Sequence, residues 1–204
     1  MNRSLVAAGV AVLFALANLA DSWVFHHAAY PRIYDQDWGR LLRLIGYLWT
    51  WVIVAAVFVA HDRSLPDTRS RGGVRRGALL LAAPIVAGLL GEVAKILVHR
   101  LRPNLTDGFH VFRPWTDQPF ATKDLGLPSS HAVVAFAAAT MLSRLLPWGT
   151  PLWYALAAAC ALTRVLSQAH FLSDVIAGAL VGYLCAALLW KRYGLRSGPD
   201  RRVL

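Results

Sequence analysis

Six long runs of hydrophobic residues alternate with short polar segments along the 204-residue chain. Each run is close to the ~20 residues that a helix needs to cross a bilayer. A cluster of turn-forming residues at 147–151 separates the fourth run from the fifth, as in two antiparallel helices. The pattern predicts an all-α, polytopic membrane protein with six transmembrane helices in one bundle and a single domain over residues 1–204. The runs lie at about 4–25, 41–60, 76–99, 130–146, 150–168 and 171–191.

Composition supports this prediction. Hydrophobic residues make up 57% of the chain and charged residues only 16%, whereas soluble domains contain about 25% charged residues. The net charge of +10 is better explained by loops that meet anionic lipid headgroups than by a nucleic-acid interface, which needs a solvated basic face. We therefore expect membrane lipids as partners and no nucleic acid. Cys160 and Cys185 lie in apolar runs and are expected to be packing residues.

The basic residues between the runs predict the orientation. Most lysines and arginines fall on the side of both termini, which favours cytoplasmic termini in a bacterial inner membrane. The alternative for the first run is a signal peptide, but the cleavage signal near Asn18 is poor and the run continues through Phe25. The larger group is Arg3, Arg63, Arg69, Arg71, Arg75, Arg76, Arg144, Lys191, Arg192, Arg196, Arg201 and Arg202. The smaller group is Arg32, Arg40, Arg43, Arg100, Arg102, Arg113 and Lys123.

Ionisable side chains occur at the ends of four runs, where burial in lipid is costly and usually marks a functional site. Helix direction alternates from span to span, so these ends share one membrane face, and the loop charges make it the outer face. The residues are Lys95, His131, Arg164, His170 and Asp174.

The residue types at this face suit a phosphate group. Lys95, Arg102 and Arg164 are cations, and arginine is able to bind phosphate through two hydrogen bonds. Ser129 and Ser130 open the fourth run, and a helix N-terminus with free N–H groups and hydroxyls is a natural anion site.

The same face carries a candidate nucleophile. His170 and Asp174 are four residues apart, so they share one side of a helix. A carboxylate in this position holds one imidazole nitrogen and leaves the other free to attack.

Three blocks of the chain resemble the signature of the type 2 phosphatidic acid phosphatase family. They are KILVHRLRP at 95–103, PSSH at 128–131 and TRVLSQAHFLSD at 163–174. The family pattern has glycine where this chain has Ser130 and serine where it has Thr163. Both replacements are small, so we expect a modest change in the phosphate cradle. The nine other signature positions match in type, order and spacing within each block.

The resemblance implies a mechanism. His170 would attack phosphorus and form a phosphohistidine, Asp174 would orient His170, and His131 would protonate the leaving oxygen and then activate water. The family needs no metal, and we expect no cofactor. The residues implied to hold the phosphate oxygens are Lys95, Arg102, Ser129, Ser130 and Arg164.

Other polar residues match no signature position. We expect Glu92 to pair with Lys95 in a structural role, Arg100 and Arg113 to be solvated rim cations, and the segment 100–129 to lie at the membrane interface beside the site.

Several further residues are expected near the interface. Asn18 and Asp21 either anchor the first span or line a gap through which lipid reaches the site. The histidines expected at interfaces or in loops are His26, His27, His61, His99 and His110. The tryptophans expected in the aromatic belts are Trp23, Trp38, Trp49, Trp51 and Trp115.

The sequence therefore predicts hydrolysis of a lipid phosphomonoester or pyrophosphate at the outer face. Undecaprenyl pyrophosphate is the favoured substrate, because recycling of that carrier requires dephosphorylation there. Phosphatidic acid, phosphatidylglycerol phosphate and lipid A phosphates remain open. A phosphotransferase with an acceptor other than water is one alternative. A non-catalytic anion-binding transporter or scaffold is another, although it would not require His131, His170 and Asp174.

Overall fold

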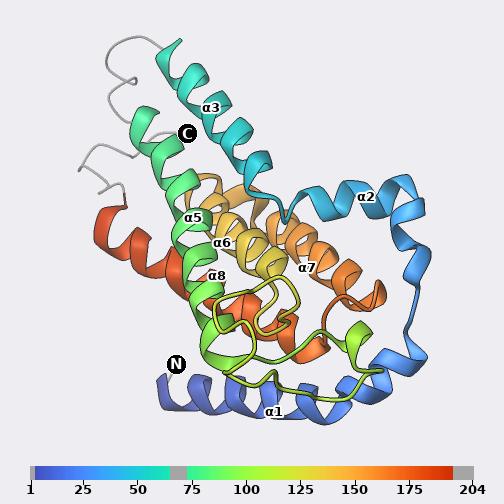
Figure 1. The fold of residues 1–204 in the computed structure, drawn as a ribbon. Coiled ribbons are helices and arrows are strands. Elements are labelled where there is room, and N and C mark those ends of the chain that lie inside the picture. Colours follow the sequence, from blue (N-terminus) through green and yellow to red (C-terminus); the bar gives the residue numbers. More distant parts are fainter. Residues whose placement is uncertain (1–2, 65–72, 195–204) are drawn as a thin grey trace.

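The computed structural model describes residues 3–64 and 73–194, in which helices are joined by loops and no strand is present (Figure 1). This confirms the all-α prediction. The helices are α1 (Arg3–His27), α2 (Asp37–Leu44), α3 (Leu48–Arg63), α5 (Gly73–Val98), α6 (Ser130–Leu145), α7 (Thr150–Leu166) and α8 (Leu172–Tyr193). Short 3-10 helices are η1 (Pro31–Asp35), η2 (Pro103–Leu105) and η3 (Pro147–Gly149). The loop cations Arg69, Arg71, Arg196, Arg201 and Arg202 lie outside the described residues.

Within residues 3–64 and 73–194, three helices are long and apolar enough to cross a membrane, with candidate spans at Ala7–His27, Val74–Val98 and Leu172–Tyr193. The bent pair of α2 and α3 is a fourth candidate. α6 has only 16 residues, and at a rise of about 1.5 Å per residue it is shorter than the ~30 Å hydrocarbon core. The chain is thus a helical membrane protein, but helix length does not establish the six spans that hydrophobicity predicts.

α6 lies at the centre of the bundle and packs against α5, α7 and α8 (Figure 1). The contact with α8 is close because Gly178 and Gly182 have no side chains. A Cβ at Gly178 would lie 2.7 Å from the Ser129 carbonyl oxygen, and one at Gly182 would lie 2.3 Å from that of Val133. Small residues at helix contacts let backbones approach, which is how helices associate in lipid. The approach also lets the Ser129 N–H donate to the Asp174 carbonyl, at 3.0 Å.

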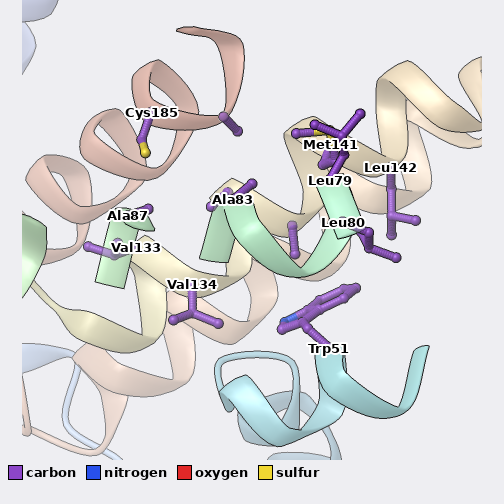
Figure 2. Packing of buried hydrophobic residues seen from close by; sticks show 13 residues of the cluster. Trp51, Leu79, Leu80, Ala83, Ala87, Val133, Val134, Met141, Leu142 and Cys185 are labelled. Atoms are coloured by element: carbon purple, nitrogen blue, oxygen red, sulfur yellow. The ribbon is translucent and has the colours of Figure 1, made fainter. Parts of the chain in front are cut away.

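The largest cluster of buried side chains joins α3, α5, α6 and α8 (Figure 2). Cys185 belongs to this cluster and Cys160 to a smaller one, and both are buried free thiols, as expected. Trp51 is only 7% exposed and belongs to this cluster. Its expected place in the aromatic belt is therefore wrong. The other tryptophans expected in the belt are exposed, namely Trp23, Trp38, Trp49 and Trp115.

The second predicted span, 41–60, is broken between α2 and α3, which meet at 66°. A break frees carbonyl groups at the end of a helix, and these need partners. The Thr50 hydroxyl donates to the Leu44 carbonyl at 2.6 Å, and the Trp51 indole N–H donates to the Ile45 carbonyl at 2.9 Å. Side chains of α3 thus satisfy the end of α2 and stabilise the bend.

The segment between α5 and α6 is held by two buried side chains. His99 stacks on Trp115 with ring centroids 4.2 Å apart and contacts the Pro119 carbonyl at 2.9 Å. Arg113 is 8% exposed and donates to the Gln118 carbonyl at 3.0 Å. His99 lies in the loop after α5, as expected, but is buried, and the expectation of a solvated Arg113 is wrong. Both residues shape the segment that lies over the ends of the bundle.

Candidate active site

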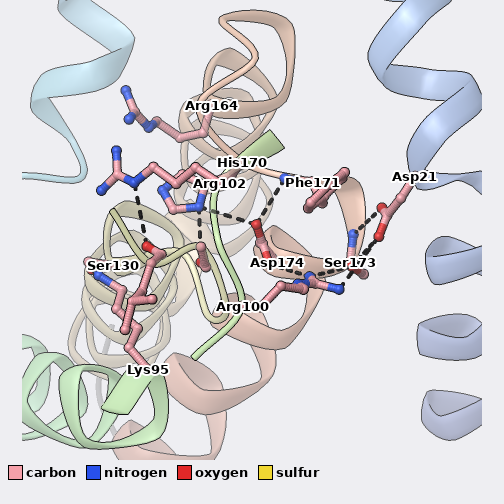
Figure 3. A network of polar contacts seen from close by, with 12 residues as sticks. Asp21, Lys95, Arg100, Arg102, Ser130, Arg164, His170, Phe171, Ser173 and Asp174 are labelled. Carbon is pink, nitrogen blue, oxygen red and sulfur yellow. Dashed lines mark hydrogen bonds and ion pairs between the residues drawn. The ribbon is translucent and has the colours of Figure 1, made fainter. Parts of the chain in front are cut away.

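The C-terminal ends of α5 and α7, the start of α6 and the residues before α8 meet at one end of the bundle (Figure 3). The structure brings the predicted residues together there, as helix alternation requires. The charges of Arg164, Arg102 and His170 all act on His131, which shows that these groups lie within electrostatic reach of one another. Figure 3 shows Lys95, Arg102, Ser130, Arg164, His170 and Asp174 at this end. Ser129, whose N–H donates to the Asp174 carbonyl, and His131 lie there too.

His170 is 3% exposed and precedes α8. Its Nδ1 lies 3.0 Å from the Gly126 carbonyl oxygen and 3.4 Å from Oδ2 of Asp174. A carbonyl oxygen only accepts hydrogen bonds, so Nδ1 carries the proton and Nε2 has the free lone pair. Burial lowers the pKa of His170 to about 4, against the opposing effect of Asp174. The imidazole is therefore neutral at pH 7 and has a nucleophilic nitrogen.

Three groups hold Asp174, which is fully buried. Oδ2 accepts a hydrogen bond from the Phe171 backbone N–H at 2.9 Å, which caps the start of α8. Oδ1 forms an ion pair with Arg100, and Oδ2 faces His170. A carboxylate fixed on both oxygens holds the imidazole in one orientation.

Arg100 connects Asp174 to α1 (Figure 3). Its guanidinium donates to the Ser173 hydroxyl at 2.7 Å and to the Asn18 side-chain oxygen at 3.0 Å, and it lies 3.8 Å from Asp21. Asp21 in turn accepts a hydrogen bond from the Ser173 backbone N–H at 2.9 Å. Arg100 and Asp21 are 2% and 1% exposed, so the expected solvated Arg100 and interfacial Asp21 are wrong. Both belong to a buried network around the site.

The segment between α5 and α6 reaches the same network. His110 Nε2 lies 3.0 Å from Asp21, and the His110 ring packs edge-on against Phe171 with centroids 4.7 Å apart. His110 thus lies in a loop, as expected, but takes part in a buried contact. The other histidines expected at interfaces are exposed, namely His26, His27 and His61.

Lys95 is paired inside the protein. Its ammonium donates to Glu92 at 2.8 Å and also to the Ser130 hydroxyl, which itself donates to Glu92 at 2.7 Å. The expected Glu92–Lys95 pair is therefore present. Ser130, where the family pattern has glycine, adds a hydroxyl to this pair. Because the Ser130 hydroxyl is already hydrogen-bonded to Lys95 and Glu92, we expect Ser130 to contact an anion through its backbone N–H.

Buried groups without a hydrogen-bond partner surround His131. Among the described residues they include Oγ of Ser129, Nε2 of His131 and Nε of Arg164. Buried polar groups in folded proteins are almost always bonded, so such a set suits an anion. Burial and then the nearby Arg164 charge lower the pKa of Arg102. This crowding of positive charge would be relieved by a phosphate between the cations.

Two tyrosines at the site were not predicted from the sequence. The Tyr34 hydroxyl accepts a hydrogen bond from Arg164 at 2.7 Å and donates to the Thr163 carbonyl at 3.2 Å. The Tyr47 ring lies edge-on to His131, with centroids 4.9 Å apart. Both precede the signature blocks by more than 40 residues, so no local pattern identifies them. Within the described ranges, no cluster of three or more His, Cys, Asp or Glu side chains is arranged to hold a metal.

Sequence comparison places these residues in a known family. The profile of the PAP2 superfamily matches residues 76–197. Lipid A 1-phosphatase of Rhizobium etli is 32% identical over 131 residues, which are 61% of this chain and 55% of that protein. Undecaprenyl-diphosphatase of Sulfolobus acidocaldarius is 30% identical over 139 residues, which are 67% of this chain and 60% of that protein. The matched region thus spans little more than half the length of these relatives.

The fold has a counterpart among solved structures. The transmembrane PAP2-type phosphatidylglycerolphosphate phosphatase of Bacillus subtilis superposes with a TM-score of 0.61 at 20% identity, over 95% of this chain and 98% of that one. The family profile covers all three signature blocks. This chain belongs to the PAP2 superfamily.

Proposed function

We propose that this chain is a metal-independent lipid phosphatase that forms a phosphohistidine at His170. The observation that carries the proposal is the state of His170. Its Nδ1–H is fixed by Gly126 and Asp174, its Nε2 is free, and unpartnered buried donors lie beside it. A neutral, oriented imidazole is suited to attack a phosphoryl group that the neighbouring unpartnered donors hold.

In the first half-reaction, Nε2 of His170 attacks phosphorus. The N–P bond forms while the bond from phosphorus to the leaving oxygen breaks. Asp174 stabilises the positive charge that develops on the imidazole, and His131 gives a proton to the leaving oxygen. The dephosphorylated lipid then departs and leaves phosphohistidine.

In the second half-reaction, His131 takes a proton from water, the water oxygen attacks phosphorus, and the N–P bond breaks. Inorganic phosphate leaves and neutral His170 returns. Lys95, Arg102 and Arg164 and the N-terminus of α6 hold the non-bridging oxygens throughout. Phosphoryl transfer depends mainly on such positioning and charge stabilisation.

A lipid substrate fits the surface around the site. Large apolar side chains are exposed on the helices that lead to it, including Leu19 at 82%, Leu97 at 66% and Trp49 at 77%. Such a surface faces hydrocarbon. The names of the relatives point to lipid A phosphate and undecaprenyl diphosphate as the kinds of substrate to test.

We also propose that the chain crosses a bacterial inner membrane six times, with both termini in the cytoplasm and the site at the outer face. The excess of basic residues on the side of the termini supports this orientation. An outer-face site suits undecaprenyl pyrophosphate, whose lipid carrier is dephosphorylated there during recycling.

The experiment measures the inorganic phosphate that the purified chain releases in detergent with a chelator present. The substrates are undecaprenyl pyrophosphate, lipid A, phosphatidylglycerol phosphate and phosphatidic acid. We expect inorganic phosphate from at least one lipid. Radiolabel transferred to another acceptor instead of phosphate would establish a transferase. No release from any of these lipids would refute the phosphatase and favour an anion-binding protein.

Gly46→Ala is expected to lower kcat by about 10- to 100-fold, because it displaces His131 from its position. A Cβ at Gly46 would lie 2.7 Å from both Cβ and Cδ2 of His131. The matched control is Gly9→Ala, since a Cβ there meets nothing within 4 Å. Initial rates on the most active lipid check the prediction, and equal rates for both variants would contradict it.

A further inference from the structure

Arg43 is a cation at the site that the family signature does not include. It lies in the last turn of α2, three residues before Gly46, where the chain passes against His131. Sequence alone identifies it only as one of the smaller group of basic residues, near the start of the second apolar run. The bend between α2 and α3 brings it to the active-site end of the bundle.

Two tyrosine rings hold the Arg43 guanidinium. Its Cζ lies 4.8 Å from the centroid of the Tyr34 ring and 5.5 Å from that of Tyr47. Tyr34 also accepts a hydrogen bond from Arg164, and Tyr47 lies edge-on to His131. Arg43 is thus connected through one aromatic ring to a phosphate-binding residue and through the other to the general acid.

The guanidinium of Arg43 has an N–H group that donates no hydrogen bond within the described part of the chain. Its Nε is buried and has no hydrogen-bond partner among the described residues. Aromatic rings stabilise the charge of a guanidinium but leave its N–H groups in the plane unbonded. A buried N–H of a charged group without an acceptor is costly, so this arrangement fits an anionic ligand that supplies one.

The position of Arg43 identifies which part of the substrate it would meet. It packs against Tyr47, whose ring lies edge-on to His131, and it lies three residues before Gly46, which passes against the same imidazole. Arg43 therefore lies on the side of the general acid, where the leaving group departs. In a prenyl monophosphate that group is a hydrocarbon chain with one hydroxyl oxygen, which offers little to a guanidinium. In a lipid diphosphate it is a second phosphate.

We propose that Arg43 binds the phosphate that remains on the lipid, and that the site is built for a lipid diphosphate. The proposal rests on the phosphatase function proposed above. His170 attacks the terminal phosphorus, the bond to the bridging oxygen breaks, and the proton from His131 goes to that oxygen. Lipid monophosphate leaves with its charge compensated by Arg43. Water then cleaves the phosphohistidine and releases inorganic phosphate.

The test compares two substrates with the same hydrocarbon chain, farnesyl diphosphate and farnesyl monophosphate. For Arg43→Gln, kcat/KM on the diphosphate is expected to fall by about 10- to 100-fold, the value of one hydrogen-bonded charge. On the monophosphate the loss is expected to be several times smaller. Arg43→Lys keeps the charge but lacks the planar pair of donors, so it should recover part of the diphosphate rate.

Arg40→Gln is the matched control, because it removes the same charge from the same short helix. The Arg40 side chain is 61% exposed and pairs with Asp37 at 2.8 Å. Both substrates should react at the parent rate in this variant. Equal losses on the two substrates in Arg43→Gln, or no loss on either, would overturn the role of Arg43. A parent protein that hydrolyses neither substrate nor any other lipid phosphate would instead overturn the phosphatase function itself.

Discussion

His170→Ala is expected to lower kcat on the most active lipid by a factor of about 10⁴ or more, while the protein keeps its fold and its affinity for the lipid. Removal of a nucleophile leaves only the contribution of binding and charge stabilisation. The side chain is buried, but the cap of α8 is formed by Phe171 and Asp174 and does not include the His170 ring. Steady-state rates and lipid binding measured on the same preparation separate the two effects.

The matched control for this variant is His61→Ala. His61 is an exposed histidine in the last turn of α3, whereas Gly46, which contacts His131, precedes the first turn of that helix. We expect the parent rate from it. Retention of even a few per cent of the parent kcat by His170→Ala would mean that another group attacks phosphorus.

Arg100→Gln is expected to lower both stability and kcat. The substitution leaves the carboxylates of Asp174 and Asp21 buried without their shared cation, and loss of one partner from a buried ion pair costs about 3–5 kcal/mol. The freed Asp174 no longer holds His170 in one orientation, so kcat should fall by about 100-fold. Thermal unfolding in detergent and steady-state rates measure the two losses.

A second substitution separates stability from catalysis. Asp21→Asn in the Arg100→Gln background removes one uncompensated buried charge, so part of the lost Tm should return. The rate should not return, because Asp174 still lacks the guanidinium that fixes it. Recovery of rate together with Tm would mean that Arg100 acts only on folding. An unchanged rate in Arg100→Gln alone would show that Asp174 needs no such support.

The parts of this protein that sequence predicted well are those set by local patterns. Long apolar runs predicted α1, α3, α5, α6, α7 and α8 but not α2 as a separate helix, because a helix in lipid must be largely apolar. Fixed spacing within the signature blocks predicted Lys95, His131 and His170, and helix alternation correctly placed them at one end of the bundle. Asp174 does lie 3.4 Å from His170, but the expected reason is wrong, because His170 precedes α8 and the two residues do not share one side of a helix.

The parts that sequence did not predict depend on contacts between distant segments. The bend after α2 requires side chains of α3 to satisfy its carbonyls, which no hydrophobic pattern records. Trp51 is buried because that bend turns it toward α6. Arg100 and Asp21 are 79 positions apart in sequence, and only the approach of α1 to α8 makes each the partner of the other. A carboxylate inside an apolar run was the one available signal for Asp21.

The hydrogen bonds of Ser129 and Ser130 predict different roles for these two serines. Ser130 has its hydroxyl engaged with Glu92 and Lys95, whereas Ser129 has a buried hydroxyl with no partner among the described residues. We therefore expect Ser129 to contact the phosphate through its side chain and Ser130 through its backbone. A signature alone does not distinguish these two serines.

The central claim is that phosphorus is transferred to His170. Its most direct test is a rapid acid-free quench of the purified protein with a lipid phosphate labelled with ³²P, followed by peptide mapping under alkaline conditions that preserve phosphohistidine. We predict label on the peptide that contains His170 and none in His170→Ala. Turnover of the labelled lipid with no label on the protein, or label on a residue other than His170, would contradict the account.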